Sequence, residues 1–244
     1  MHEILANSTF RIVCGESTGS GFSYKFEDII VTNYHVIKST FVSGERIYAL
    51  TEDNQPLITE LLAYSDEKEY DFAILKLQSK LPNNRKILQP DLNISLKRGI
   101  KTIFSGFPHG IHDLLVHEAI ISNCNYDKLF YLDGSINGGN SGGPIIEYSS
   151  GKVIGIITQR RFLSPFNYED TKQQIINISN TCKKFINNGG GVFINGLDIS
   201  KVVGLISQAL SVTSDVVDAN SNVGIGIGFK INFVEEKLVE LGYK

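Results

Sequence analysis

Short segments with the composition of β-strands recur along most of the chain. They are rich in β-branched and aromatic residues and are separated by turn residues, a pattern typical of strands. Those before residue 80 are FRIVCG, GSGFSY, DIIVTNYHVI, RIYALT and DFAILKL, and those after residue 100 are KTIFSGF, LVHEAIISN, KLFYLD, GPIIEY and GKVIGIIT. Strands at intervals of roughly 8–15 residues, with few helical patterns between them, predict antiparallel barrels or a sandwich.

Residues 162–215 interrupt this pattern with helical periodicity. Ile178 and Cys182 are spaced as on one face of a helix, and Gly189 follows as a possible C-cap. A second apolar stripe begins after Ser200, which we expect to be the N-cap of its helix. A strand, VGIGIGFKIN, and a short helix, FVEEKLVELG, follow. We therefore expect a helical insertion in an otherwise β protein.

Length and composition set broad limits on the function. The 244 residues suffice for one large domain or two small lobes. Apolar residues make up 42% and charged residues 20%, which is ordinary for a globular protein. The net charge of −3 offers no basic surface, so we expect neither a nucleic-acid nor a membrane partner.

The N-terminal segment and the cysteines predict a cytoplasmic location. The segment lacks the basic and apolar regions of a secretory signal, and no apolar run approaches the ~20 residues of a membrane span. Cys14, Cys124 and Cys182 are odd in number and widely spaced, which predicts reduced thiols rather than a disulfide framework.

The stretch SINGGNSGGP at 135–144 raises the possibility of a nucleophilic serine. A serine hydroxyl is weak at neutral pH and needs a general base, an acid that orients the base, and N–H donors for the developing oxyanion. The glycines around Ser141 permit backbone conformations that other residues avoid, so this turn can aim the N–H groups of Gly139 and Ser141 at one point. Alone, the stretch fits a glycine-rich hairpin turn equally well.

Two residues earlier in the chain are candidates for the base and the acid. His35 follows the strand-like run DIIVTN, and Asp71 opens the apolar run FAILKL. Taken singly, the histidine fits a structural role and the aspartate fits a cap. Together with Ser141 they form an ordered set in three distinct sequence frames.

At these residues the sequence resembles the chymotrypsin-like serine proteases, most closely their HtrA branch. The patterns of that branch, TNxHV, DxAxLK and GNSGGP, stand here as TNYHVI, DFAILKL and GGNSGGPII. GSGF, GKVIGI and VGIGIGFKI also match the family frame, and the resemblance covers about residues 8–160 and 222–241.

The resemblance implies an all-β fold of two six-stranded antiparallel barrels with a site between them. It places the N-terminal barrel at 1–82, a connector at 83–96 and the C-terminal barrel at 97–244, with the helical insertion at 162–215 and a C-terminal helix. It also implies a serine endopeptidase that forms an acyl-enzyme and needs no cofactor or metal.

The resemblance assigns each catalytic role to a residue of the matched motifs. Ser141 is the nucleophile, His35 the base and Asp71 its orienting acid, and the N–H groups of Gly139 and Ser141 form the oxyanion hole. The alternatives are a catalytically silent binding module with a protease fold and a hydrolase of other acyl bonds, such as esters.

The chain departs from the family at three points. Asn140 replaces the aspartate with which digestive members pair a new N-terminal ammonium, so we do not expect activation by N-terminal cleavage. The length leaves no room for the PDZ domain usual in the HtrA branch. The insertion at 162–215 could line the cleft, cap the site, dock an activating protein or be a packed decoration. We expect low basal activity and a regulatory protein partner.

The specificity pocket is expected from the same resemblance. Ser135 should lie at its base, with Thr158, Gln159 and Arg160 on one wall and Gly228 to Lys230 on the other. No acidic residue lies at the base, so a buried Lys or Arg of the substrate would lack a partner. We expect a small or medium apolar residue before the cleaved bond; Arg160 or Lys230 turned inward would favour an acidic one instead.

Three histidines, His109, His112 and His117, lie close together in the sequence. Their spacing matches no standard zinc pair, so we expect no metal there.

Overall fold

The computed structural model describes residues 1–162, 168–188, 193–220 and 222–243; at 159–162, 168–169, 171, 188, 215–220 and 222–223 it describes the backbone alone. The chain divides into two compact units. The first comprises Met1–Arg161 and Gly224–Lys244, and the second is Phe162–Val223.

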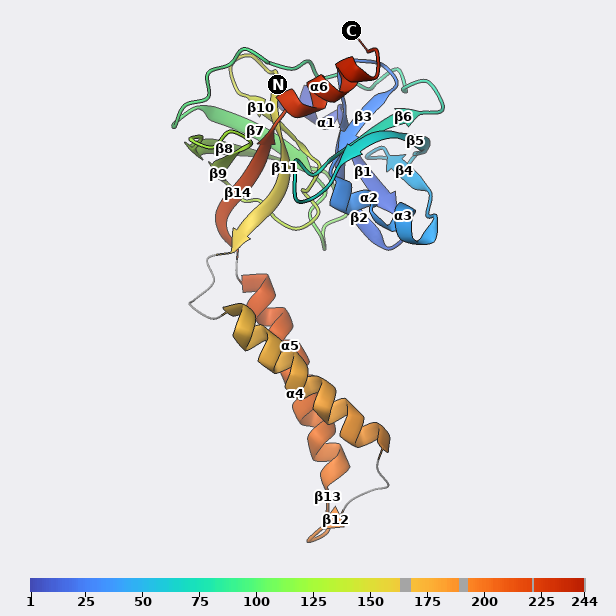
Figure 1. The fold of residues 1–244 in the computed structure, drawn as a ribbon, viewed down its shortest axis with the longest axis vertical. Coiled ribbons are helices and arrows are strands. Elements are labelled where there is room, and N and C mark those ends of the chain that lie inside the picture. Colours follow the sequence, from blue (N-terminus) through green and yellow to red (C-terminus); the bar gives the residue numbers. More distant parts are fainter. Residues whose placement is uncertain (163–167, 189–192, 221, 244) are drawn as a thin grey trace. The chain divides into compact units, whose positions relative to one another are not determined.

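Six strands of the first unit close into a barrel in the order β1-β2-β3-β6-β5-β4 (Figure 1). They are β1 (Thr9–Cys14), β2 (Ser17–Ser23), β3 (Ile29–Thr32), β4 (Ile47–Leu50), β5 (Pro56–Ser65) and β6 (Phe72–Leu77). Pairing of β1 with β4 completes the ring, so no strand edge of this barrel is left open. Alternate side chains such as Phe10, Ile12 and Leu75 fill its interior.

A second barrel follows in the order β10-β11-β14-β9-β8-β7. Its strands are β7 (Lys101–Gly106), β8 (Leu115–Asn123), β9 (Leu129–Asp133), β10 (Pro144–Glu147), β11 (Val153–Phe162) and β14 (Asn222–Lys230). The predicted fold of two six-stranded antiparallel barrels is confirmed. The predicted domain boundaries within the chain stay a prediction.

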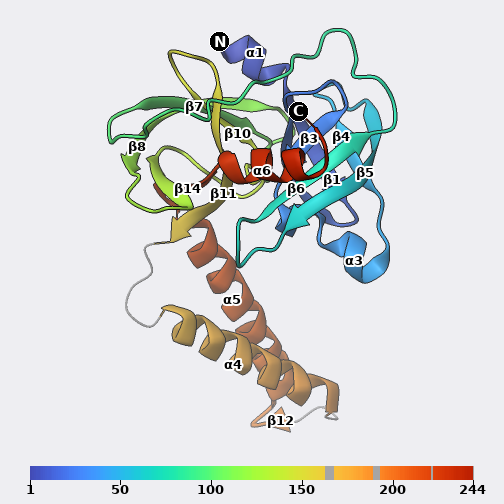
Figure 2. The same ribbon diagram turned by 45° about the horizontal axis from the view of Figure 1, so that its top comes forward.

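An apolar cluster joins the two barrels. Val31 of β3 and Ile156 of β11 belong to it, together with Leu238 of α6 (Asn232–Glu240). Figure 2 shows α6 lying across the place where the barrels meet. Tyr24 donates a hydrogen bond to Oε2 of Glu235 on this helix, at 3.1 Å. Burial, with that carboxylate beside it, raises the pKa of Tyr24 far above its usual range.

The second unit is a helical hairpin inserted between β11 and β14. Its elements are α4 (Tyr168–Asn188), β12 (Phe193–Ile194), β13 (Leu197–Asp198) and α5 (Ile199–Asn220). A buried contact of 3.1 Å between the hydroxyls of Ser179 and Ser207 lies where the two helices pack. None of the helices in the described ranges is both long and apolar enough to span a membrane.

One helix cap differs from the sequence prediction. Ser200 is not the N-cap of α5, because the helix begins at Ile199. Asp198 has that role instead: its Oδ1 accepts hydrogen bonds from the N–H groups of Ser200 (3.0 Å) and Lys201 (3.4 Å). Gly189, the predicted C-cap of α4, lies outside the described residues. The helical region also extends beyond residue 215, since α5 ends at Asn220.

Candidate active site

The pairing of β3 with β6 brings His35 and Asp71 together. His35 lies in the short helix α2 (Tyr34–Ile37) directly after β3, and Asp71 immediately precedes β6. Because Thr32 pairs with Ala73, the ends of the two strands are neighbours. Nδ1 of His35 lies 2.7 Å from Oδ2 of Asp71, and the backbone N–H of His35 donates to Oδ1 at 3.0 Å.

Asp71 is almost fully buried and strained. Its side chain has an exposed fraction of 2%, and its φ of 45° falls in the left-handed region that non-glycine residues rarely adopt. The amide of Asn33 donates to the Asp71 carbonyl oxygen at 2.6 Å and so holds this backbone conformation. Such strain is typically retained where the surroundings fix a functional side chain.

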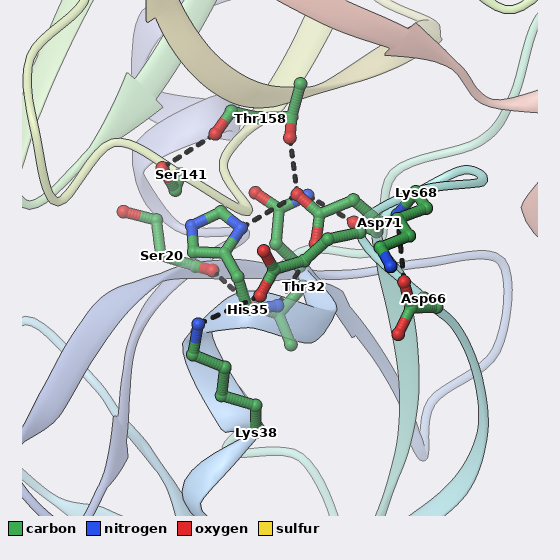
Figure 3. A network of polar contacts seen from close by, with 11 residues as sticks. Ser20, Thr32, His35, Lys38, Asp66, Lys68, Asp71, Ser141 and Thr158 are labelled. Atoms are coloured by element: carbon green, nitrogen blue, oxygen red, sulfur yellow. Dashed lines mark hydrogen bonds and ion pairs between the residues drawn. The ribbon is translucent and has the colours of Figure 1, made fainter. Parts of the chain in front are cut away.

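Thr158 of β11 connects the second barrel to this pair. Its hydroxyl donates a hydrogen bond to Oδ2 of Asp71, and its carbonyl oxygen accepts one from Oγ of Ser141 at 3.0 Å (Figure 3). Thr158 was predicted to be a wall of the specificity pocket. Its hydroxyl instead serves the buried carboxylate, whose charge is satisfied by three hydrogen bonds from His35 and Thr158.

Ser141 and His35 line one cleft of about 540 Å³. Figure 3 shows the imidazole of His35 between Asp71 and Ser141. The remaining lining residues are Glu16, Ser17, Thr18, His109, Gly138 and Gly139. Within the described part of the chain no hydrogen bond joins Ser141 to His35, since the serine hydroxyl is directed at Thr158.

The turn around Ser141 requires glycine at two positions. Gly139 has a φ of 91° and Gly142 a φ of 87°. A Cβ at Gly139 would lie 2.2 Å from the carbonyl oxygen of Phe107, and one at Gly142 would lie 2.0 Å from that of Ser20. No side chain fits at these distances, so the two glycines are needed for the shape of the turn.

The same turn leaves two backbone N–H groups for a ligand. The N–H of His109 donates to the carbonyl oxygen of Gly138 at 2.7 Å, which fixes that peptide group. Since a trans peptide directs its N–H opposite to its C=O, the N–H of Gly139 points away from the His109 backbone. Neither this N–H nor that of Ser141 donates to any described residue. The hydroxyl of Ser20 steadies the turn by donating to the Gly139 carbonyl oxygen at 2.7 Å.

Asn140 is fully buried between these donors. Oδ1 of Asn140 lies 2.8 Å from the position a Cβ would take at Gly106, and within the described residues neither Oδ1 nor Nδ2 has a hydrogen-bond partner. A carboxylate at this position would be a buried charge without a partner, which costs far more free energy than a neutral amide.

Of the predicted specificity residues whose side chains the structure describes, none lines the Ser141 cleft. Ser135 is exposed and is not among the residues that line the Ser141 cleft. Gly228 faces Phe130 and Ile145 in the barrel core, and Lys230 lines a separate pocket of about 350 Å³. The side chains of Gln159 and Arg160 lie outside the described residues.

Ile136, next to the predicted pocket base Ser135, is a core residue of the second barrel. Its side chain is 1% exposed, and its Cδ1 lies 1.8 Å from the position that a Cβ would take at Gly226 of β14. The only signal in the sequence is an apolar residue next to Ser135, which does not reveal a contact with a strand far along the chain.

The three clustered histidines take different positions. His109 lines the cleft, and its Nδ1 lies 3.1 Å from where a Cβ of Gly138 would be. His117 stacks on Phe104 with ring centroids 4.9 Å apart. The carbonyl oxygen of His112 accepts a hydrogen bond from Arg11.

Comparisons with known proteins agree with this arrangement. The family model for the trypsin-like peptidase domain matches residues 19–156. A probable periplasmic serine endoprotease, DegP-like, from Hahella chejuensis is 33% identical over 151 residues, which cover 59% of this chain and 30% of that protein. The magnetosome formation protease MamE of Paramagnetospirillum magneticum is 31% identical over 165 residues, covering 63% and 21% of the two chains.

Solved structures show the same fold. The serine endoprotease from Yersinia pestis superposes with a TM-score of 0.55 at 23% identity, over 65% of this chain and 57% of that one. The inactive form of the Rv3671c protease gives a TM-score of 0.53 at 20% identity, over 66% and 80% of the two chains. This chain matches only about a fifth to a third of the length of the curated relatives.

Proposed function

Because the chain belongs to the trypsin-like peptidase family, we propose that it is a serine endopeptidase acting through Ser141, His35 and Asp71. The observation that supports this most is the 2.7 Å contact between His35 and the buried Asp71, with His35 and Ser141 lining one cleft. DegP-like and MamE relatives are named as proteases, which agrees with a polypeptide substrate.

In the proposed reaction Oγ of Ser141 attacks the carbonyl carbon of the scissile peptide while Nε2 of His35 takes its proton. Asp71 holds Nδ1–H and so stabilises the imidazolium. The oxyanion accepts hydrogen bonds from the N–H groups of Gly139 and Ser141, which donate to no described residue. His35 then gives the proton to the leaving amine, and an acyl-enzyme remains. Water activated by His35 hydrolyses this ester.

The direction of the Ser141 hydroxyl supports a resting state with low activity. Its hydrogen bond to the Thr158 carbonyl must be exchanged for one to His35 before attack. The same contact favours the second candidate, a catalytically silent binding module with a peptidase fold. In the proposed enzyme, substrate or an activating protein redirects the hydroxyl to His35.

Labelling with a fluorophosphonate probe separates these two candidates. We expect the wild-type chain to be labelled and the Ser141→Ala variant to be unlabelled, while Ser43→Ala, at an exposed serine of α3 (Ser39–Ser43), is labelled at the wild-type rate. Labelling of Ser141→Ala would contradict the assignment. A wild-type chain that is inert even with a library of unfolded polypeptides would favour the binding module.

We further propose narrow specificity, with a small apolar residue before the cleaved bond. Among the described residues that line the cleft, the acidic one, Glu16, is exposed, so a buried Lys or Arg of the substrate would lack a partner there. A peptide library tests this, and strong cleavage after Lys or Arg would contradict it. The regulatory partner and the cytoplasmic location stay predictions.

A further inference from the structure

One end of the inserted hairpin carries a cluster of exposed apolar side chains, here called the tip patch. It consists of Phe185, Phe193, Ile194 and Leu197, with exposed fractions of 41%, 67%, 56% and 57%. Figure 1 shows β12 and β13 at one end of the two helices, opposite the ends where the chain enters α4 and leaves α5. With 21 residues in α4, the tip lies about 30 Å from those connections.

The local structure presents these side chains outward. β12 and β13 contain two residues each and are joined by Asn195 and Gly196, whose φ values of 50° and 79° form a tight two-residue turn. So short a ribbon has no face broad enough to bury its own side chains. Three large apolar residues on it therefore remain largely exposed to solvent, an arrangement that marks an interaction site.

Three exposed lysines on the adjoining ends of the two helices are here called the basic collar. Lys183 and Lys184 lie before the last turn of α4, and Lys201 lies in the first turn of α5. Asp198 is the sole acidic residue of the sequence between positions 171 and 214. Its carboxylate is largely buried, caps α5 and lies 3.9 Å from Nζ of Lys201, so it offsets the collar only in part.

Apolar side chains on β12 and β13, with lysines on the adjoining ends of α4 and α5, match the layers of a membrane interface. The apolar groups reach the boundary of the acyl chains, and the ammonium groups lie at the level of the phosphates. We propose that the hairpin tip docks this protein on the surface of an anionic lipid membrane. The net charge of −3 predicted no such partner, but a local collar acts within a Debye length regardless of distant acidic residues.

A vesicle flotation experiment on the full chain tests the docking. We expect association with phosphatidylcholine vesicles that contain about a third phosphatidylglycerol, weaker association with pure phosphatidylcholine, and loss of binding at high salt. Replacing Phe193, Ile194 and Leu197 together by serine should weaken binding at least ~50-fold. Lys183→Gln with Lys184→Gln should weaken it ~10-fold or more.

The matched control places the same chemistry elsewhere on the hairpin. Leu205 and Val212 of α5 are 66% and 54% exposed, so changing both to serine removes exposed apolar surface away from β12 and β13, although from two residues rather than three. This variant should bind the vesicles within about twofold of wild type, and far-UV circular dichroism should show the same helix content for all variants.

The absence of tryptophan from the chain allows a direct measurement of insertion. The Phe193→Trp variant should show a blue shift of its emission on adding anionic vesicles and quenching by brominated lipid. The Val212→Trp variant should show neither effect.

The proposal would be overturned if the chain did not associate with anionic vesicles or if the triple serine variant associated as fully as wild type. It would also be overturned if the control variant with serine at Leu205 and Val212 lost as much vesicle binding as the triple serine variant. A light-scattering measurement that shows a dimer dissociated by the tip substitutions, without lipid binding, would assign the tip patch to a second copy of the chain. The proposal is independent of catalysis, so inactivity towards peptides leaves it standing.

Discussion

The hydroxyl of Thr158 donates a hydrogen bond to Oδ2 of Asp71, and this contact links the second barrel to the candidate acid of the first. The acceptor oxygen is the one that also faces Nδ1 of His35. The position of the carboxylate therefore depends on the packing of both barrels, and the orientation of the imidazole depends on it in turn.

Removing this hydroxyl should slow catalysis without abolishing it. In Thr158→Val the carboxylate loses one of three hydrogen bonds, so we expect kcat to fall ~10-fold and the free energy of unfolding to fall by roughly 1.5–3 kcal/mol. Thr158→Ser keeps a hydroxyl and should restore most of kcat. Steady-state kinetics on a cleaved peptide and urea unfolding check this, and a Thr158→Val variant with wild-type kcat would contradict the role of the contact.

A methyl group at Gly139 should disable the oxyanion turn. It would have to enter the space of the Phe107 carbonyl oxygen, 2.2 Å away, and displace the N–H donor. We expect fluorophosphonate labelling of Gly139→Ala to slow ~10²–10³-fold, as for loss of one oxyanion-hole donor.

Gly99→Ala is the matched control for backbone strain. Gly99 has a φ of 86°, close to that of Gly139, but no atom lies within 4 Å of its Cβ position. This variant should lose some stability through strain and keep the wild-type labelling rate. If labelling slowed equally in Gly139→Ala and Gly99→Ala, the slowing could not be attributed to the geometry of the turn around Ser141.

His117 should make the fold less stable in mild acid. Desolvation lowers its pKa below the ordinary value of 6.5, and its Nε2 has no partner among the described residues. As the pH falls from 7 to 5, His117 binds a proton in the unfolded chain before it does so in the folded chain. The free energy of unfolding that neutral His117 allows above pH 6.5 therefore decreases. Urea unfolding of wild type and His117→Phe at both pH values should show a smaller loss in the variant. An identical loss in both would contradict this prediction.

Shortening Ile136 should destabilise the second barrel. Its side chain is 1% exposed and belongs to the apolar cluster of that barrel, so Ile136→Ala leaves a cavity against Gly226. We expect the free energy of unfolding to fall by roughly 2–5 kcal/mol in urea unfolding. Because Ile136 does not line the Ser141 cleft, the folded variant should keep the wild-type rate of fluorophosphonate labelling. Unchanged stability in Ile136→Ala would contradict this prediction.

Much of the fold and the candidate triad could be predicted because their signals are local. Each strand can be predicted from the alternating composition of its own residues. The candidate catalytic residues His35, Asp71 and Ser141 each lie in a short recognisable motif. The packing of Ile136 against Gly226 in the core of the second barrel could not be predicted, since it depends on which strands become neighbours in a closed barrel. The role of Thr158 was missed for a similar reason: its hydroxyl acts on a residue of the other barrel.

The cap of α5 and the strands β12 and β13 were missed for a different reason. Two residues per strand are too few to show alternation, and both Asp198 and Ser200 are good N-cap residues. Choosing between the two depends on where the preceding turn ends, which the helical pattern alone does not define.

The insertion point of the helical unit has a consequence for how this chain can be altered. β11 and β14 are neighbours in one barrel, and the unit Phe162–Val223 leaves from one strand and returns to the other. In the topology of the barrel, the whole unit takes the place of the hairpin turn between these two neighbouring strands. It is therefore a module that can be exchanged for an ordinary short turn or for another hairpin while the barrel keeps its strand order.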